Sequence, residues 1–283
     1  MLYDTLIIGA GPAGAAAARL LAQAGWSVAL VEKAEFPRRK VCGEFISATT
    51  MPVLEECGVA ADYLALAGPP VTRVGVYAGR ALLTAPRERL WGRALGREHL
   101  DTLLRDAAVK AGAVLYQPAE VTGLRRDGDH HIATLDYGRE IAARTVIAAC
   151  GSWNAKGPFA LPLRDASSDL FAFKAHFTNA ALSPGLMPLL AFPGGYGGLV
   201  MSDSGRLSLS CCIRRDVLAA VRRQHGGKAG EAVIAHIRAT TLGVERALVG
   251  AALEGSTLAT GPIHPGIRPR VRDGVYMSGN LAG

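Results

Sequence analysis

The sequence has 283 residues, of which 49% are hydrophobic and 19% are charged, enough for one large domain or two closely packed ones around a buried core. The formal net charge of +7 comes from scattered arginines, which are densest at residues 38–40, 125–126, 214–215 and 222–223. No aromatic residues interleave with these groups, so we expect solvated surfaces and no nucleic-acid interface.

The five cysteines show neither even pairing nor the spacing of metal ligands, so reduced thiols in a cytoplasmic protein are the simplest interpretation. The sequence contains no charged leader, no cleavage site and no apolar stretch of membrane-spanning length, and we expect a soluble protein without a transmembrane segment. Metal binding is not expected, because these histidines lack ligand spacing and fit surface or packing positions: His99, His130, His131, His225, His236 and His264.

The N-terminal residues predict a βαβ unit. Residues 3–8 are continuously apolar, as in a buried parallel strand, and a glycine-rich turn follows them. Residues 13–24 are rich in alanine and predict a helix that ends at Gly25. Residues 27–31 then provide a second buried strand.

Further elements follow in chain order. Helices are expected at residues 47–57, 97–112 and 217–238. Short strands are expected twice between residues 71 and 84, and then at residues 114–116, 120–126, 130–137 and 140–149. Longer strands of an antiparallel sheet are expected at residues 171–177, 190–201 and 207–213, with a final strand at residues 274–278. Glycine and proline cluster at residues 152–161, where we expect a domain boundary.

The turn after the first strand reads Gly9-Ala10-Gly11-Pro12-Ala13-Gly14, which has the G-x-G-x-x-G spacing of a dinucleotide-binding loop. Gly9 permits the tight turn, Gly11 lets a pyrophosphate approach the backbone, and Gly14 allows the helix to pack closely on the strands. Pro12 suits the first helical turn, where no amide donor is needed. The amides and positive dipole end of the helix would then face the phosphates.

Glu32 ends the second strand, where its carboxylate can accept hydrogen bonds from a ribose diol. A carboxylate there also disfavours a 2′-phosphate, so NADP is not expected in this half of the site. The alternative is a glycine turn followed by a surface glutamate, but the strand, turn, helix and acid occur in the required order. These residues alone leave both NAD and FAD open.

Longer motifs resemble known flavoproteins. Asp4-Thr5-Leu6-Ile7-Ile8-Gly9-Ala10-Gly11-Pro12-Ala13-Gly14, followed by Val31-Glu32-Lys33, resembles the FAD-binding start of glutathione-reductase-like flavoproteins. Phe36-Pro37-Arg38-Arg39-Lys40-Val41-Cys42-Gly43-Glu44 resembles the corresponding segment of geranylgeranyl-reductase-like enzymes, which are related to the aromatic-ring flavin hydroxylases.

Three further segments strengthen this resemblance. Arg97-Glu98-His99-Leu100-Asp101-Thr102-Leu103-Leu104 is similar to an R-x-x-L-D-x-x-L helix whose arginine lies near the FAD phosphates. Phe192-Pro193-Gly194-Gly195-Tyr196-Gly197-Gly198 resembles a P-x-G-Y-x-W substrate-side strand, with Gly198 where tryptophan is usual. Gly274-Val275-Tyr276-Met277-Ser278-Gly279-Asn280-Leu281-Ala282-Gly283 is similar to the second flavin motif, commonly G-D-A-A-G.

The resemblance implies an α/β fold with an α+β second domain: a Rossmann-like FAD-binding domain into which an antiparallel substrate sheet is inserted. We expect the first part of the FAD domain at residues 1–155, the substrate domain at 156–265, and a return to the FAD domain at 266–283. The residues expected to bind FAD are Gly9, Gly11, Pro12, Ala13, Gly14, Glu32, Lys33, Cys42, Gly43, Arg97, Val121, Gly279 and Asn280. Cys42 and Tyr196 are the candidate catalytic residues, the former beside the isoalloxazine and the latter lining the pocket over it.

The function implied by the resemblance is the reduction of a lipid-like or polyketide-like alkene by reduced flavin, with NAD(P)H as a candidate electron donor. Cys150-Gly151 and Asn280 replace the Asp-Gly and aspartate of the hydroxylases, which favours the reductase branch over the alternative of a monooxygenase acting on an aromatic ring. The sequence ends on the second flavin motif, so we also expect a C-terminally truncated chain, and an inactive FAD-binding fragment is a further alternative. The oligomeric state stays open.

Overall fold

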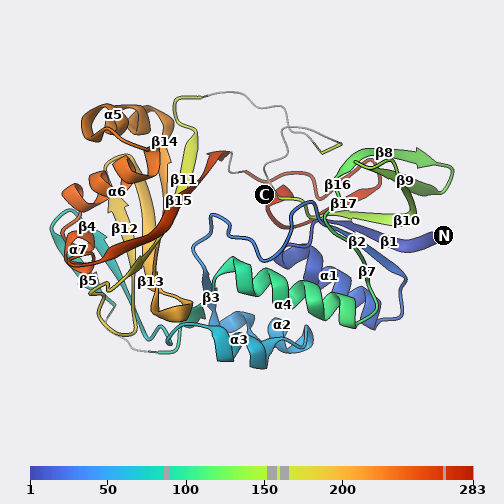
Figure 1. The fold of residues 1–283 in the computed structure, drawn as a ribbon, viewed down its shortest axis with the longest axis horizontal. Coiled ribbons are helices and arrows are strands. Elements are labelled where there is room, and N and C mark those ends of the chain that lie inside the picture. Colours follow the sequence, from blue (N-terminus) through green and yellow to red (C-terminus); the bar gives the residue numbers. More distant parts are fainter. Residues whose placement is uncertain (86–88, 152–157, 160–165, 264–265, 283) are drawn as a thin grey trace.

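A computed structural model describes residues 1–85, 89–151, 158–159, 166–263 and 266–282. It consists of two lobes, each built on one large sheet (Figure 1). We call these the first sheet, which contains the N-terminal strand, and the second sheet, which is mainly antiparallel. No helix among these residues is long and apolar enough to span a membrane.

The first sheet has eight strands, with β1 at its centre. Its main path, in spatial order, is β16 (Val271–Arg272), β17 (Val275–Met277), β10 (Glu140–Ala148), β1 (Leu2–Ile8), β2 (Val28–Val31) and β7 (Val114–Tyr116). The hairpin of β8 (Val121–Asp127) and β9 (His130–Leu135) joins this path through β10. β1 pairs in parallel with both β10 and β2, and its Leu6 and Ile7 are fully buried, which explains the continuous apolar run.

Two helices lie together against the first sheet. They are α1 (Pro12–Gln23) and α4 (Arg97–Lys110), which pack against each other below the sheet in Figure 1. Alanines on α1, including the fully buried Ala15 and Ala18, permit this close approach. Short elements extend the lobe: β3 (Phe45–Ser47), α2 (Met51–Glu56), α3 (Ala60–Leu66) and β6 (Gly92–Ala94).

The second sheet has seven strands. In spatial order they are β15 (Ala252–Ile263), β11 (Leu170–Thr178), β14 (Leu207–Arg214), β13 (Gly195–Met201), β12 (Leu186–Phe192), β4 (Arg73–Ala78) and β5 (Ala81–Thr84). All neighbouring pairs are antiparallel except β12 and β4. β4 and β5 therefore lie in this sheet, although their sequence falls in the segment expected to form the first domain.

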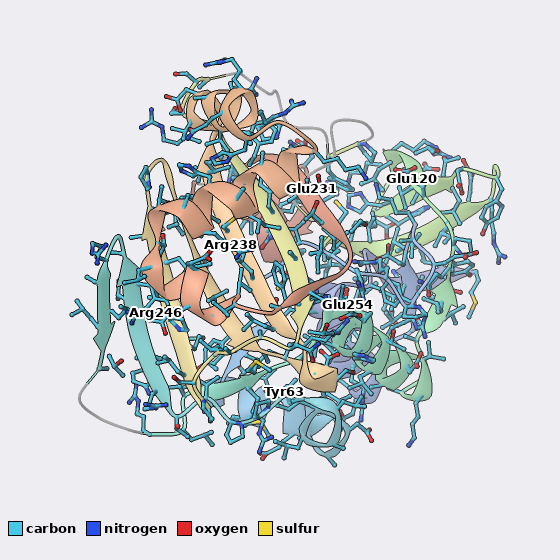
Figure 2. All side chains as sticks on the ribbon, turned by 60° about the vertical axis from the view of Figure 1, so that its left-hand side comes forward. Tyr63, Glu120, Glu231, Arg238, Arg246 and Glu254 are labelled. Carbon is cyan, nitrogen blue, oxygen red and sulfur yellow. The ribbon has the colours of Figure 1, made fainter. Side chains whose placement is uncertain are left out.

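One face of the second sheet is covered by α5 (Arg215–His225), α6 (Ala229–Thr240) and α7 (Leu242–Ala247). Figure 2 shows Glu231, Arg238 and Arg246 on this helical layer. Side chains alternate across the strands, so Phe173 and Leu209 are buried beneath the helices. Lys174 and Ser210 point to the opposite face, toward the first lobe.

The predicted fold class is confirmed, but two predicted elements are wrong in detail. Residues 190–201 form a hairpin of β12 and β13 instead of one strand, because Gly194 adopts a positive φ of 81° at the turn. The helix predicted at residues 217–238 is two helices, since Gly226 and Gly227 both have positive φ values, 67° and 68°. Most of the boundary predicted at residues 152–161 lies outside the described residues.

Candidate functional site

A cleft of about 470 Å³ lies where the two lobes meet. It is lined by the glycine turn and the strand ends of the first sheet, and by Leu258, Ala259 and Thr260 from β15 of the second sheet. Its size is within the range usual for ligand sites. The predicted cofactor residues that line it are Gly9, Gly11, Pro12, Ala13, Glu32, Lys33, Arg97, Val121, Gly279 and Asn280.

The glycine turn has the close contacts that the fingerprint predicts. Gly9 has a φ of +105°, and a Cβ on it would lie 2.5 Å from the carbonyl oxygen of Ala149. Gly14 does not line the cleft but packs beneath it, where a Cβ would lie 1.8 Å from the carbonyl oxygen of Gly9. The first turn of α1 has no intrahelical acceptors for its amides, so this end of the cleft fits a pyrophosphate.

Glu32 is buried at the end of β2, with 6% of its surface exposed. Its carboxylate accepts hydrogen bonds from the backbone amides of Ala10 and Ala34, both at 2.9 Å, and Arg38 approaches it at 3.4 Å. A carboxylate offers about four lone-pair sites, so roughly one remains for a ribose hydroxyl. Lys33 is more exposed and pairs with Glu120 across 3.5 Å.

Arg97 lies at the start of α4 and faces the glycine turn. Its Nε and Nη2 donate to the two oxygens of Asp101, at 2.6 and 2.9 Å. Burial disfavours the charged guanidinium, but these bonds outweigh burial and raise the pKa of Arg97 above its ordinary value. A Cβ on Gly11 would lie 3.5 Å from Arg97 Nη2, so the fixed positive charge stands beside the proposed pyrophosphate position.

Arg38 corrects one sequence prediction. The basic group at residues 38–40 was expected to be a solvated surface, but only 12% of the Arg38 side chain is exposed and Arg38 lines the cleft. Its guanidinium lies between Glu32 and Asp101, at 3.4 and 3.3 Å, and over the ring of Phe36. Glu32 is six residues away but Asp101 is 63 residues away, so composition alone could not reveal this burial.

Cys42 and Gly43 lie in the loop after β2 and are not among the residues lining the cleft, whereas the preceding Lys40 and Val41 are. Cys42 interacts with the guanidinium of Arg97. Gly43 lies against the second sheet, where a Cβ on it would be 3.5 Å from Ser210 Oγ. The loop thus passes between the cleft and the second sheet.

The segment that resembles the second flavin motif returns to the glycine turn. Gly279 has a φ of +60°, and a Cβ on it would lie 3.2 Å from the Cβ of Ala13. The amide of Ser278 donates to the carbonyl of Ala148 at 2.9 Å, which fixes this segment at the end of β10. Asn280 lines the cleft, so residues more than 260 positions apart meet at one site.

Tyr196 lies outside the cleft, on the face of the second sheet that the helices leave uncovered. It is 57% exposed, and its hydroxyl interacts with the thiol of Cys212, its partner on β14. The electrostatic effect of Cys212, together with burial, raises the pKa of the Tyr196 phenol. The phenol therefore stays protonated at neutral pH.

One group of side chains has the spacing of metal ligands among the described residues: Glu98, His99 and Asp203. Arg206 donates to both carboxylates, at 3.0 Å to Glu98 and in a shorter contact to Asp203. The guanidinium already supplies the positive charge that a metal ion would bring, so this group is an ion network between the lobes.

Comparison with known proteins agrees with this geometry. A model of the FAD binding domain family matches residues 2–158. The chain is 31% identical over 156 residues to a menaquinone reductase of Mycobacterium tuberculosis, covering 53% of this chain and 38% of that protein. It is 28% identical over 236 residues to digeranylgeranylglycerophospholipid reductase 2 of Methanopyrus kandleri, covering 76% and 55%.

A myxobacterial chondrochloren halogenase has the same fold, with a TM-score of 0.81 at 20% identity over 99% of this chain and 68% of the halogenase. The chain spans between 38% and 55% of the length of the two reductases. Because the family model covers more than half of the chain, the protein belongs to the FAD binding domain family of FAD-dependent oxidoreductases.

Proposed function

We propose that the protein reduces a carbon–carbon double bond in a hydrophobic, lipid-like or polyketide-like substrate. Bound FAD would supply the hydride when reduced, with NAD(P)H as the electron donor. The residues that line the cleft would hold the cofactor. Residues 1–155 and 266–283 would form the FAD domain, and residues 156–265 the substrate domain between them. The reductase relatives support the reaction class.

The proposal of a hydrophobic substrate rests on apolar side chains exposed on the face of the second sheet opposite its helices. Leu83, Val76 and Leu189 are direct cross-strand partners on this face, and they are 64%, 38% and 54% exposed. Large exposed apolar patches mark binding surfaces. The face is thus suited to an extended apolar chain.

The strand register connects this apolar face to the cleft. Leu189 pairs with Gly198, Gly198 with Ser210, Ser210 with Lys174, and Lys174 with Leu258, which lines the cleft. All these residues share one face, because directly paired residues do so. A substrate on the apolar face would therefore end beside the loop of residues 40–44, which contacts Lys174 in this row and whose Lys40 and Val41 line the cleft.

Gly198 leaves room in this row for the substrate. A Cβ on Gly198 would meet only the carbonyl oxygen of Pro188, at 3.6 Å. The related strand motif commonly has tryptophan at this position, so the glycine widens the surface next to Tyr196. Tyr196, whose phenol stays protonated, is our candidate for delivering a proton to the double bond, and Cys42 is our candidate for contacting the isoalloxazine.

The test is reoxidation of the reduced holoprotein without oxygen. Protein loaded with FAD and reduced by dithionite is mixed with geranylgeraniol or, separately, with 4-hydroxybenzoate, and flavin absorbance is followed. We expect the isoprenoid alcohol to reoxidise the flavin anaerobically and to yield a product in which one double bond has been reduced for each flavin reoxidised. Reoxidation that occurs only after oxygen is admitted and gives a hydroxylated aromatic product would support the monooxygenase alternative. Reduced flavin that the isoprenoid alcohol does not reoxidise would contradict the proposed reduction.

A Gly198→Trp variant sharpens this test. We expect it to retain FAD, because Gly198 lies outside the cleft, and to lose reoxidation by the long isoprenoid, because the indole would fill the row between Leu189 and Ser210. Unchanged reoxidation by the isoprenoid would contradict the proposed location of the substrate.

A further inference from the structure

Three buried ionisable side chains meet between the two lobes: Glu44, Lys174 and His176. Their side chains are 0%, 1% and 3% exposed. The ammonium of Lys174 donates to one carboxylate oxygen of Glu44, and Nε2 of His176 lies 2.9 Å from the other. Burial would raise the pKa of Glu44, but the bond to His176 and the charge of Lys174 outweigh it and lower that pKa to about 2. We call this group the Glu44 triad.

The triad holds a loop against the second sheet. Lys174 and His176 lie on β11, whereas Glu44 ends the loop of residues 40–44, more than 125 positions away in sequence. Lys174 Nζ also donates to the carbonyl of Lys40, at 3.4 Å. Both ends of the loop are therefore bound by one ammonium group.

Further contacts define the conformation of the same loop. Glu44 has a φ of +61°, which is uncommon for a residue with a side chain. Its amide donates to Cys42 Sγ at 3.4 Å, and its carbonyl accepts from the amide of Leu95 at 3.1 Å. A side chain that is anchored by two partners can maintain a backbone conformation of this kind.

Stability alone is a poor explanation for this arrangement. Desolvation of a buried ion pair offsets much of its attraction, and apolar replacements of similar volume are often neutral or stabilising. An ion pair does, however, require one particular geometry of its partners. The triad lies behind a loop whose Lys40 and Val41 line the cleft, so the geometry that it requires sets the position of this part of the cleft wall.

We infer that the Glu44 triad is a positioning device that fixes the loop of residues 40–44 as a preformed wall of the FAD cleft. Glu44, Lys174 and His176 are positioning residues, since none of them lines the cleft. The triad joins the first lobe to the second sheet, because Glu44 precedes β3 of the former and Lys174 and His176 lie on β11 of the latter. The inference rests on the FAD site proposed above.

The experiment separates positioning from stability by removing one charge or both. Glu44→Gln leaves Lys174 buried without its counter-charge, whereas Glu44→Gln combined with Lys174→Met removes both charges and retains similar volumes. Urea unfolding and FAD titration by flavin fluorescence are measured for each protein. Glu245→Gln is the matched control, because it makes the same change in an exposed acid paired with Arg238 on the helical layer.

We expect Glu44→Gln to lower the urea midpoint and the double variant to recover most of that loss. FAD affinity should remain at least tenfold weaker than wild type in both, and unchanged in Glu245→Gln. Recovery of FAD affinity to within twofold of wild type in the double variant would overturn the inference. Failure of the wild-type protein itself to bind FAD would instead refute the FAD site, and the inference with it.

A measurement on the wild-type protein covers the case in which the variants do not fold. Hydrogen exchange of the amides of residues 41–44 is followed with and without FAD. A preformed wall requires these amides to exchange at least tenfold more slowly than an unstructured chain before FAD is added. Exchange at the unstructured rate, with protection only after FAD binds, would overturn the inference.

Discussion

Gly14→Ala is the substitution whose effect follows most directly from the geometry of the cofactor site. A Cβ on Gly14 would lie 1.8 Å from the carbonyl oxygen of Gly9 and 3.1 Å from its carbonyl carbon. Both are backbone atoms, so no change of rotamer can relieve the contact. Because real Cβ atoms keep at least 3.0 Å, the N-terminus of α1 must move by roughly 1 Å away from β1.

Two opposing effects set the magnitude. Alanine in a helix is favoured over glycine by about 1 kcal/mol. Overpacking a tight contact costs about 1–3 kcal/mol, and a clash between backbone atoms lies at the upper end of that range. We therefore expect Gly14→Ala to lower the free energy of unfolding by about 1–2 kcal/mol in spite of its better helix propensity.

Cofactor affinity should fall as well, because the amides of the first turn of α1 would leave the pyrophosphate position. A loss of about 1.4 kcal/mol corresponds to a tenfold rise in the FAD Kd, and we expect at least that. Urea unfolding and fluorescence titration measure the two effects. Gly123→Ala in β8 is the control, since its nearest neighbour would lie at 3.6 Å. A Gly14→Ala protein as stable as wild type, with the same Kd, would refute the reasoning.

Three further predictions concern other parts of the protein. Arg97→Met leaves the buried carboxylate of Asp101 with the longer contact from Arg38, at 3.3 Å. Breaking a buried pair of this kind costs about 3 kcal/mol, and urea unfolding should show this loss of stability. Titration with FAD should show a Kd raised at least about tenfold. The pKa of Glu44 is lowered from 4.5 to about 2, so its stabilising contribution is complete above pH 4.5 and is lost as the pH falls to 2. Unfolding measured across this window should show that wild type loses on the order of 3 kcal/mol more than Glu44→Gln, and parallel curves would argue against an ionised Glu44. Tyr196→Phe should retain FAD affinity, because Tyr196 lies outside the cleft, but slow substrate reduction at least about tenfold in stopped-flow measurements; an unchanged rate would exclude proton delivery by the phenol.

The first half of the cofactor site could be predicted because its physical signals are local. The apolar run of β1, the glycine turn and the acid at the end of β2 lie within 32 residues, and each has a defined backbone role. The resemblance to flavoproteins also predicted that the distant Gly279 and Asn280 bind FAD, and both line the same cleft in the structure. Their roles toward FAD stay predictions.

Elements of the second sheet were harder to predict. β15 (Ala252–Ile263) was missed entirely, since none of its residues is buried and its register shifts twice against β11. Without a buried face the strand has no apolar alternation in its sequence. The breaks at Gly194 and at Gly226-Gly227 were visible as glycines, but their positive φ values were not inferred.

The Glu44 triad could not have been derived from spacing. Glu44 is 130 residues from Lys174, so only the tertiary structure brings the two together. One local signal was present: Lys174 and His176 alternate with Phe173 and Phe177 along β11, which places the two polar side chains on the face opposite the apolar core. The pattern identifies the shared face but not the carboxylate that occupies it.

The central claim, that the cleft between the lobes is an FAD site, is tested most directly by titrating the purified wild-type protein with FAD and following the quenching or enhancement of flavin fluorescence. We expect saturable binding of one FAD per chain, at least about tenfold weaker in Gly14→Ala and unchanged in Gly123→Ala. No saturable binding, or equal affinity in Gly14→Ala, would contradict the account.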